Sequence, residues 1–167
     1  VNGKLTEVQA KVYNAVLEAA DAAFAVAKPG TKFSEIHEAA MNVLAHRLEE
    51  WGLLPVSADV SLTVEGGQHR RWMPHGTSHH LGLDVHDCAQ AKAELYMWAE
   101  LEPGMVFTIE PALYFKDEDL SVPEEYRGIG IRLEDDVLCT EDGNVNLSAA
   151  LPRTVEGIEE WMAKLAK

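Results

Sequence analysis

Hydrophobic side chains recur at helical spacing through the first fifty residues and predict two amphipathic helices. The first begins at a capping box in residues 6–9, and residues 28–30 (Lys-Pro-Gly) should end it. The second runs through residues 34–51, and Gly52 has the place of the glycine that commonly follows a helix. Both apolar faces are broad enough to pack against a sheet.

Further along the chain, short apolar runs between polar turns predict β-strands. Residues 61–64 and residues 105–110 are two such runs. Residues 128–136 alternate between apolar and polar side chains, which is the period of a strand. This alternation places Arg132 and Glu134 together on the polar face.

The last part of the chain predicts a hairpin and a helix. Residues 141–144 (Glu-Asp-Gly-Asn) are typical of a hairpin turn, and residues 154–167 have a helical pattern. The inward side of this helix should carry Val155, Ile158, Met162 and Leu165. No repeat, linker or low-complexity tract separates these segments, so residues 1–167 are expected to form a single domain of the α+β class.

The composition narrows the partners and the location that can be expected. The 28 acidic and 14 basic residues give a formal net charge of −14, which argues against nucleic acid and anionic membranes as partners. No apolar run approaches the roughly 20 residues of a membrane span. We expect no signal peptide, and Cys88 and Cys139 have no metal-like spacing. Two reduced thiols, and hence a cytoplasmic location, are therefore expected.

Four of the seven histidines lie between residues 72 and 87, and this cluster indicates chemistry. His75, His79, His80 and His86 are interleaved with small residues. Histidine is the commonest metal ligand and the usual acid or base near neutral pH. A lone histidine is more often structural, but four in so short a segment favour a functional site.

Two glutamates in strand-like segments add to this picture. Glu110 ends an apolar run, and Glu134 lies on a strand whose other face is apolar. A carboxylate in such a place is costly unless it is paired or bound to a cation, although a solvent-facing glutamate on an edge strand is the simpler alternative for either residue alone. Together with the histidines they predict an imidazole and carboxylate site suited to Mn²⁺, Fe²⁺, Co²⁺ or Zn²⁺. The neighbouring residues 135–136 (Asp-Asp) are expected to form a turn or to be solvated.

Three phrases of the sequence resemble successive motifs of one enzyme family. They are residues 75–87 (HGTSHHLGLDVHD), residues 101–114 (LEPGM through Tyr114) and residues 130–136 (GIRLEDD). In order and spacing they are similar to the motifs of the Xaa-Pro aminopeptidase (aminopeptidase P) and prolidase group, within the creatinase and methionine aminopeptidase superfamily. The resemblance covers essentially the whole chain. It implies a partial pita-bread fold, in which a curved antiparallel sheet is packed with helices.

The resemblance also implies a set of metal ligands. His79 would bind one metal ion, Glu110 would be a second ligand and a proton shuttle, and Glu134 would bridge two ions. The intact enzyme would hold two divalent ions, with manganese favoured over cobalt, iron or zinc.

Three further residues would act on the substrate if the resemblance holds. His75 and His86 would hydrogen-bond the peptide or the tetrahedral intermediate, and Arg132 would fix the bridging carboxylate or the substrate; His80 receives no role. The implied reaction releases the N-terminal residue from a peptide with proline in second place. A prolidase acting on Xaa-Pro dipeptides is the alternative, and a homo-oligomer is expected in either case.

The sequence departs from the family pattern at its start. The family site has two more ligands, aspartates on a β-hairpin that would lie immediately upstream of Val1. We therefore expect the chain to lack the N-terminal strands, to hold no ion or one weakly bound ion, and to be inactive alone. A non-catalytic module that binds a peptide or protein is the other reading, but such a module has no physical reason to keep six functional residues.

Overall fold

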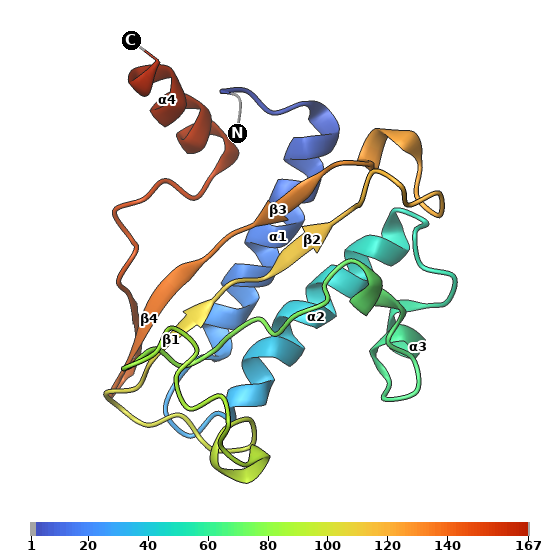
Figure 1. The fold of residues 1–167 in the computed structure, drawn as a ribbon. Helices are drawn as coiled ribbons and strands as arrows, with labels where there is room; N and C mark the ends of the chain where they lie inside the picture. Colours follow the sequence, from blue (N-terminus) through green and yellow to red (C-terminus); the bar gives the residue numbers. More distant parts are fainter. Residues whose placement is uncertain (1–2, 167) are drawn as a thin grey trace.

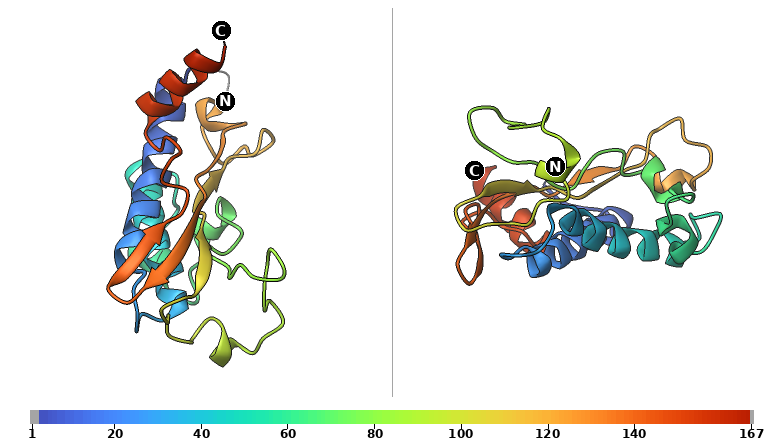
Figure 2. Two further views of the ribbon diagram at one scale, coloured as in Figure 1. Left: turned by 90° about the vertical axis from the view of Figure 1, so that its left-hand side faces the viewer. Right: turned by 90° about the horizontal axis from the view of Figure 1, so that it is seen from below.

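Two long helices form one layer of the molecule, and the β-strands form a second layer on top of them (Figure 1, Figure 2). The computed structural model describes residues 3–166. Helix α1 spans Glu7–Val26 and helix α2 spans Phe33–Glu50. The capping box is confirmed, because the Thr6 hydroxyl accepts a hydrogen bond from the Gln9 amide at 3.2 Å. Gly52 follows α2 with φ +70°, as predicted.

The strands form one long antiparallel ladder that is interrupted once. Strand β1 (Val106–Ile109) pairs with β4 (Asp135–Thr140), and β2 (Ala112–Tyr114) pairs with β3 (Gly130–Arg132). The expected single strand over residues 128–136 is therefore two strands. The ladder breaks opposite Pro111, which has no N–H to donate.

The pairing on both sides of the break fixes which residues face each other across it. Ile109 lies opposite Asp135 and Ala112 lies opposite Arg132. Counting inward from both pairs places Glu110 directly opposite Glu134. Alternate side chains of this ladder point to opposite faces, as expected for strands.

The face of the ladder that lacks these glutamates packs on the two helices. Its core consists of buried apolar side chains from α1, α2 and the strands, among them Val12, Val16, Ile36, Leu44, Leu48, Phe107, Ile109, Leu113 and Val137. The prediction that the two helices pack against a sheet is confirmed. The polar face of the ladder is left to carry the candidate site.

The prediction of a strand over residues 61–64 is wrong. The short helix α3 spans Ala58–Leu62 and begins at Ser57, whose hydroxyl accepts a hydrogen bond from the Val60 amide at 3.3 Å. A serine cap of this kind stabilises the first turn of a helix, which outweighs the strand preference of a few β-branched residues. Within residues 3–166, three 3₁₀ turns lie in the loops, at Gln68–Arg71, Ala93–Leu95 and Glu124–Tyr126.

The C-terminal part of the chain matches the prediction only in outline. The predicted hairpin turn joins β4 to β5 (Gly143–Asn146), and helix α4 spans Val155–Leu165 beside the start of α1 (Figure 1). On its expected inward side, Val155, Ile158 and Met162 are partly buried, whereas Leu165 is 64% exposed. No residue of this helix is fully buried, so the helix adds little to the core.

The expectation of a solvated aspartate pair is wrong for Asp135. Its side chain is buried and forms an ion pair with Arg153 at 3.0 Å between Oδ2 and Nε. Arg153 also pairs with Asp21 on α1 at 2.9 Å. The segment leading to α4 is thus tied to both the sheet and the first helix.

Candidate metal centre

The histidine segment runs alongside β1 as an irregular extra strand. The Glu110 amide donates to the Thr77 carbonyl at 2.7 Å, and the Thr108 amide donates to the His79 carbonyl at 2.9 Å. The Leu81 amide donates to the Val106 carbonyl at 2.9 Å. These bonds place the His79 side chain next to the break in the β-ladder.

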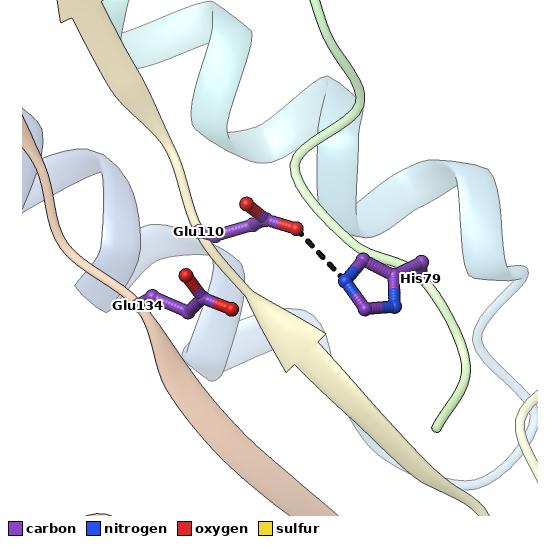
Figure 3. A group of neighbouring side chains, drawn as sticks. All are labelled: His79, Glu110 and Glu134. Atoms are coloured by element: carbon purple, nitrogen blue, oxygen red, sulfur yellow. Dashed lines mark ion pairs between the residues drawn. The ribbon is translucent and has the colours of Figure 1, made fainter. Parts of the chain in front are cut away.

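His79, Glu110 and Glu134 come together from three separate segments of the chain (Figure 3). Each offers one ligand atom, and these atoms all lie within 4.8 Å of one another. The distance from His79 Nε2 to Glu110 Oε1 is 3.1 Å. The Glu110 and His79 side chains are only 11% and 14% exposed, whereas Glu134 is 44% exposed and faces the open side of the site.

The orientation of the His79 ring fits a metal ligand. Its Nδ1 lies 3.2 Å from the His80 carbonyl oxygen, which can only accept, so Nδ1 carries a proton. In the neutral ring, Nε2 then presents a lone pair to Glu110 Oε1. Two electron-rich atoms at that distance need a proton or a cation between them. Donation from the second ring nitrogen to a carbonyl is also the usual support of a metal-bound histidine.

The two carboxylates also require a positive charge beside them. Glu110 and Glu134 are cross-strand neighbours on one face, and like charges placed so are destabilising in the absence of a counter-charge. Arg132 supplies part of it, with Nη1 3.9 Å from Glu110 Oε2 and Nε 3.7 Å from Glu134 Oε2. One imidazole and two carboxylates are a suitable donor set for a divalent transition metal.

A buried hydroxyl that sequence reasoning missed joins two of these ligands. Thr108 Oγ1 accepts from the His79 amide at 3.1 Å and donates to Glu110 Oε1 at 3.3 Å. Thr108 lies two residues before Glu110 on the same strand, and therefore on the same face. That spacing is the one signal in the sequence that could have identified it.

His75 lies outside the three-ligand group and is connected to Arg132 through Tyr114. The His75 Nδ1 lies 2.8 Å from the Gly76 carbonyl, so this nitrogen donates and Nε2 accepts. The Tyr114 hydroxyl donates to His75 Nε2 at 2.9 Å and accepts from Arg132 Nη1 at 3.4 Å. Tyr114 was not among the residues predicted from the sequence. Its two hydrogen bonds hold the phenol in a fixed direction at the edge of the site.

The other two histidines of the cluster have different surroundings. His86 is exposed, and its ring meets that of His79 edge-on with 4.4 Å between centroids. His80 turns away from the site and stacks on Phe33 at 4.3 Å. Burial lowers the pKa of His80. The structure thus brings His86 to the site and places His80 in an aromatic cluster.

Comparison with known proteins gives a consistent picture. The family model described as metallopeptidase family M24 matches residues 1–141. Xaa-Pro aminopeptidase 1 of Streptomyces coelicolor is 55% identical over 165 residues, which are 99% of this chain and 33% of that protein. The Xaa-Pro aminopeptidase of Escherichia coli is 41% identical over 170 residues, which cover 100% of this chain and 37% of the relative. The chain thus spans about a third of the length of these relatives.

Solved structures of aminopeptidases have the same fold. Aminopeptidase PepP of Pseudomonas aeruginosa matches with a TM-score of 0.90 at 38% identity, covering 98% of this chain and 36% of that one. Zinc-substituted E. coli aminopeptidase P in complex with product matches with a TM-score of 0.90 at 40% identity, over 99% and 37% of the two chains. The expected pita-bread fold is confirmed by this likeness. Among residues 3–166, every helix is too short or too polar to cross a bilayer.

Proposed function

Because the chain belongs to metallopeptidase family M24, we propose that it supplies the histidine and glutamate part of the metal centre of an Xaa-Pro aminopeptidase. The observation that carries the proposal is the convergence of His79, Glu110 and Glu134 within 4.8 Å. The names of the relatives, which align over nearly the whole chain, support the reaction and the substrate.

In this proposal His79 Nε2 and the carboxylates of Glu110 and Glu134 hold divalent metal. A divalent ion there would supply Lewis-acid chemistry, polarising a peptide carbonyl and activating water. Two ions, with manganese favoured over cobalt, iron or zinc, remain the prediction for the complete site. Its two further aspartate ligands are those implied by the family resemblance.

Glu110 is proposed both to hold metal and to move protons. Its Oε2 faces Arg132, and its Oε1 receives the Thr108 hydrogen bond, so the carboxylate is held on both sides. A fixed carboxylate beside the reacting atoms can accept a proton from water and return it to the leaving amine. The buried position of Glu110 supports this role, because the proton is then exchanged with the substrate rather than with bulk solvent.

His75, His86 and Arg132 are proposed to contact the peptide. Arg132 and His75 share the Tyr114 hydroxyl, so their polar atoms are kept at a fixed separation along one side of the metal site. His86 is exposed, and its ring contacts that of His79. A peptide held by these three side chains would lie beside the metal ligands.

The metal site can be tested on the chain itself. Titration with Mn²⁺, followed by paramagnetic broadening in NMR spectra, should first affect His79, Glu110 and Glu134. Glu134→Gln should abolish that local broadening, while Glu141→Gln, an exposed glutamate of the β4–β5 turn, should leave it unchanged. Broadening spread evenly over the acidic surface would contradict a built site.

The substrate can be tested in the same spectra. An Xaa-Pro-Yaa peptide added to the Mn²⁺-loaded chain should shift the resonances of His75, His86 and Arg132. A matched Xaa-Ala-Yaa peptide should not. Equal shifts with both peptides would contradict recognition of proline.

A further inference from the structure

A histidine outside the motif cluster is bonded to the segment that carries His79. His37 lies half-buried on α2, and its Nδ1 is 3.2 Å from the Thr77 amide nitrogen and 3.0 Å from the Thr77 hydroxyl. Because a backbone N–H can only donate, Nδ1 must accept. The bond therefore requires the neutral ring with its proton on Nε2.

Thr77 is also hydrogen-bonded to the β-ladder. Its side chain is fully buried, and its carbonyl accepts the hydrogen bond from the Glu110 amide at 2.7 Å. Two residues further on, the His79 carbonyl accepts from the Thr108 amide. The backbone of Thr77 is thus bonded in two directions: its amide donates to His37 on helix α2, and its carbonyl accepts from the Glu110 amide at the end of strand β1.

We propose that His37 is a positioning residue, which uses Nδ1 to fix Thr77 and thereby the alignment of the His79 segment with Glu110. A residue that only filled space here would need no acceptor atom, and an apolar side chain would serve equally well. The consequence for metal binding rests on the proposed function. The consequence for the alignment of the two segments does not.

The surroundings of His37 keep its ring in the required form. Burial, followed by the neighbouring His69, Arg70 and His75, lowers the pKa of His37 to about 4. All three neighbouring groups are basic. Neutral His37 therefore remains an acceptor for Thr77 throughout the pH range in which a peptidase of this kind would work.

Three variants separate positioning from packing. His37→Leu removes the acceptor and fills the space with an apolar side chain. His37→Asn keeps an acceptor near the place of Nδ1. His46→Leu is the matched control, because His46 is an exposed histidine of the same helix. Amide hydrogen exchange at Glu110 reports the alignment directly, and Mn²⁺ affinity at pH 7 reports its effect on the site.

We expect His37→Leu to speed exchange of the Glu110 amide by roughly 5- to 10-fold, which is the effect of one lost hydrogen bond. Mn²⁺ affinity should fall by about 10-fold, the lower end of the usual effect of groups that support metal ligands. His37→Asn should restore most of both values, and His46→Leu should change neither.

Two results would overturn the inference. One is unchanged Glu110 exchange in a folded His37→Leu variant. The other is a folded His37→Asn variant that exchanges as fast as His37→Leu, because the acceptor would then be irrelevant. If the unaltered chain shows no local Mn²⁺ binding, the proposed function fails, but the exchange measurements still decide the role of His37.

Discussion

The opposed glutamates lead to a prediction about stability: Glu134→Gln should change it in opposite directions without and with a divalent ion. Glu134→Gln keeps the shape of the side chain and removes one of the two like charges. Without divalent ions, the variant should therefore be slightly more stable than the unaltered chain. Like charges directly opposite on neighbouring strands fall within an interaction range of about 0.2–1 kcal/mol.

The structure places the expected gain at the low end of that range. Glu134 is 44% exposed, so solvent screens its charge, and Arg132 lies within 4 Å of both carboxylates and already offsets part of the repulsion. We expect a gain of about 0.3 kcal/mol in the free energy of unfolding in EDTA. In Mn²⁺ at 100 times the dissociation constant, the unaltered chain should instead gain about 2.7 kcal/mol, and Glu134→Gln should gain far less.

Thermal unfolding with and without Mn²⁺ measures both effects. For a chain of this size the ion should raise the midpoint by roughly 5–10 °C in the unaltered protein. The order of stability of the two proteins should then reverse between EDTA and Mn²⁺. A Glu134→Gln variant that is clearly less stable in EDTA, or that keeps the full Mn²⁺ shift, would refute the reasoning. Glu141→Gln serves as the control for loss of one surface charge.

Three other predictions follow from buried polar groups. Thr108→Val, which removes the hydroxyl between two proposed ligands, should cost about 1–3 kcal/mol in urea unfolding and weaken Mn²⁺ binding; equal stability would contradict that bridge. His37, with its pKa lowered to about 4 from 6.5, should add stability above pH 6.5 that is lost as the pH falls to 4. The loss should reach at most about 3 kcal/mol, and the pH slope should flatten in His37→Asn. Asp135→Ala leaves the Arg153 Nε without its carboxylate partner, and the free energy of unfolding in urea should fall by about 3 kcal/mol. A fall below about 1 kcal/mol would contradict a buried ion pair.

Local chemistry made several elements predictable from the sequence. Thr6 marks the start of α1 by hydrogen bonds within the capping box, and Gly52 marks the end of α2 by its positive φ. Both features depend only on residues close by in the sequence. Residues 129–134 alternate as predicted, which put Arg132 and Glu134 on one face before any pairing was known. The candidate ligands could be chosen from residue type and motif resemblance, since carboxylates in apolar strands are unusual.

Features that depend on distant parts of the chain could not be predicted in this way. The error at residues 61–64 has a different origin, because the signal was local: Ser57 caps a short helix that ends at Leu62, and the strand pattern of the following residues was given more weight. Asp135 lies opposite the buried Ile109, on the face that packs on the helices, and the partner of its charge, Arg153, comes eighteen positions later. His37 contacts Thr77 only because α2 packs beside the histidine segment, and neither spacing nor composition encodes that contact.

Glu110 and Glu134 face each other at the break in the ladder, so ion binding depends on the correct pairing of the strands. If β3 and β4 slipped by one residue along β1 and β2, Leu133 would take the position opposite Glu110, and Glu134 would point into the layer of helices. The misfolded sheet would then expose leucine, bury a charge and lose a ligand in a single step. A divalent ion would select the correctly paired chains, so adding it during refolding should raise the yield of native protein as well as its stability.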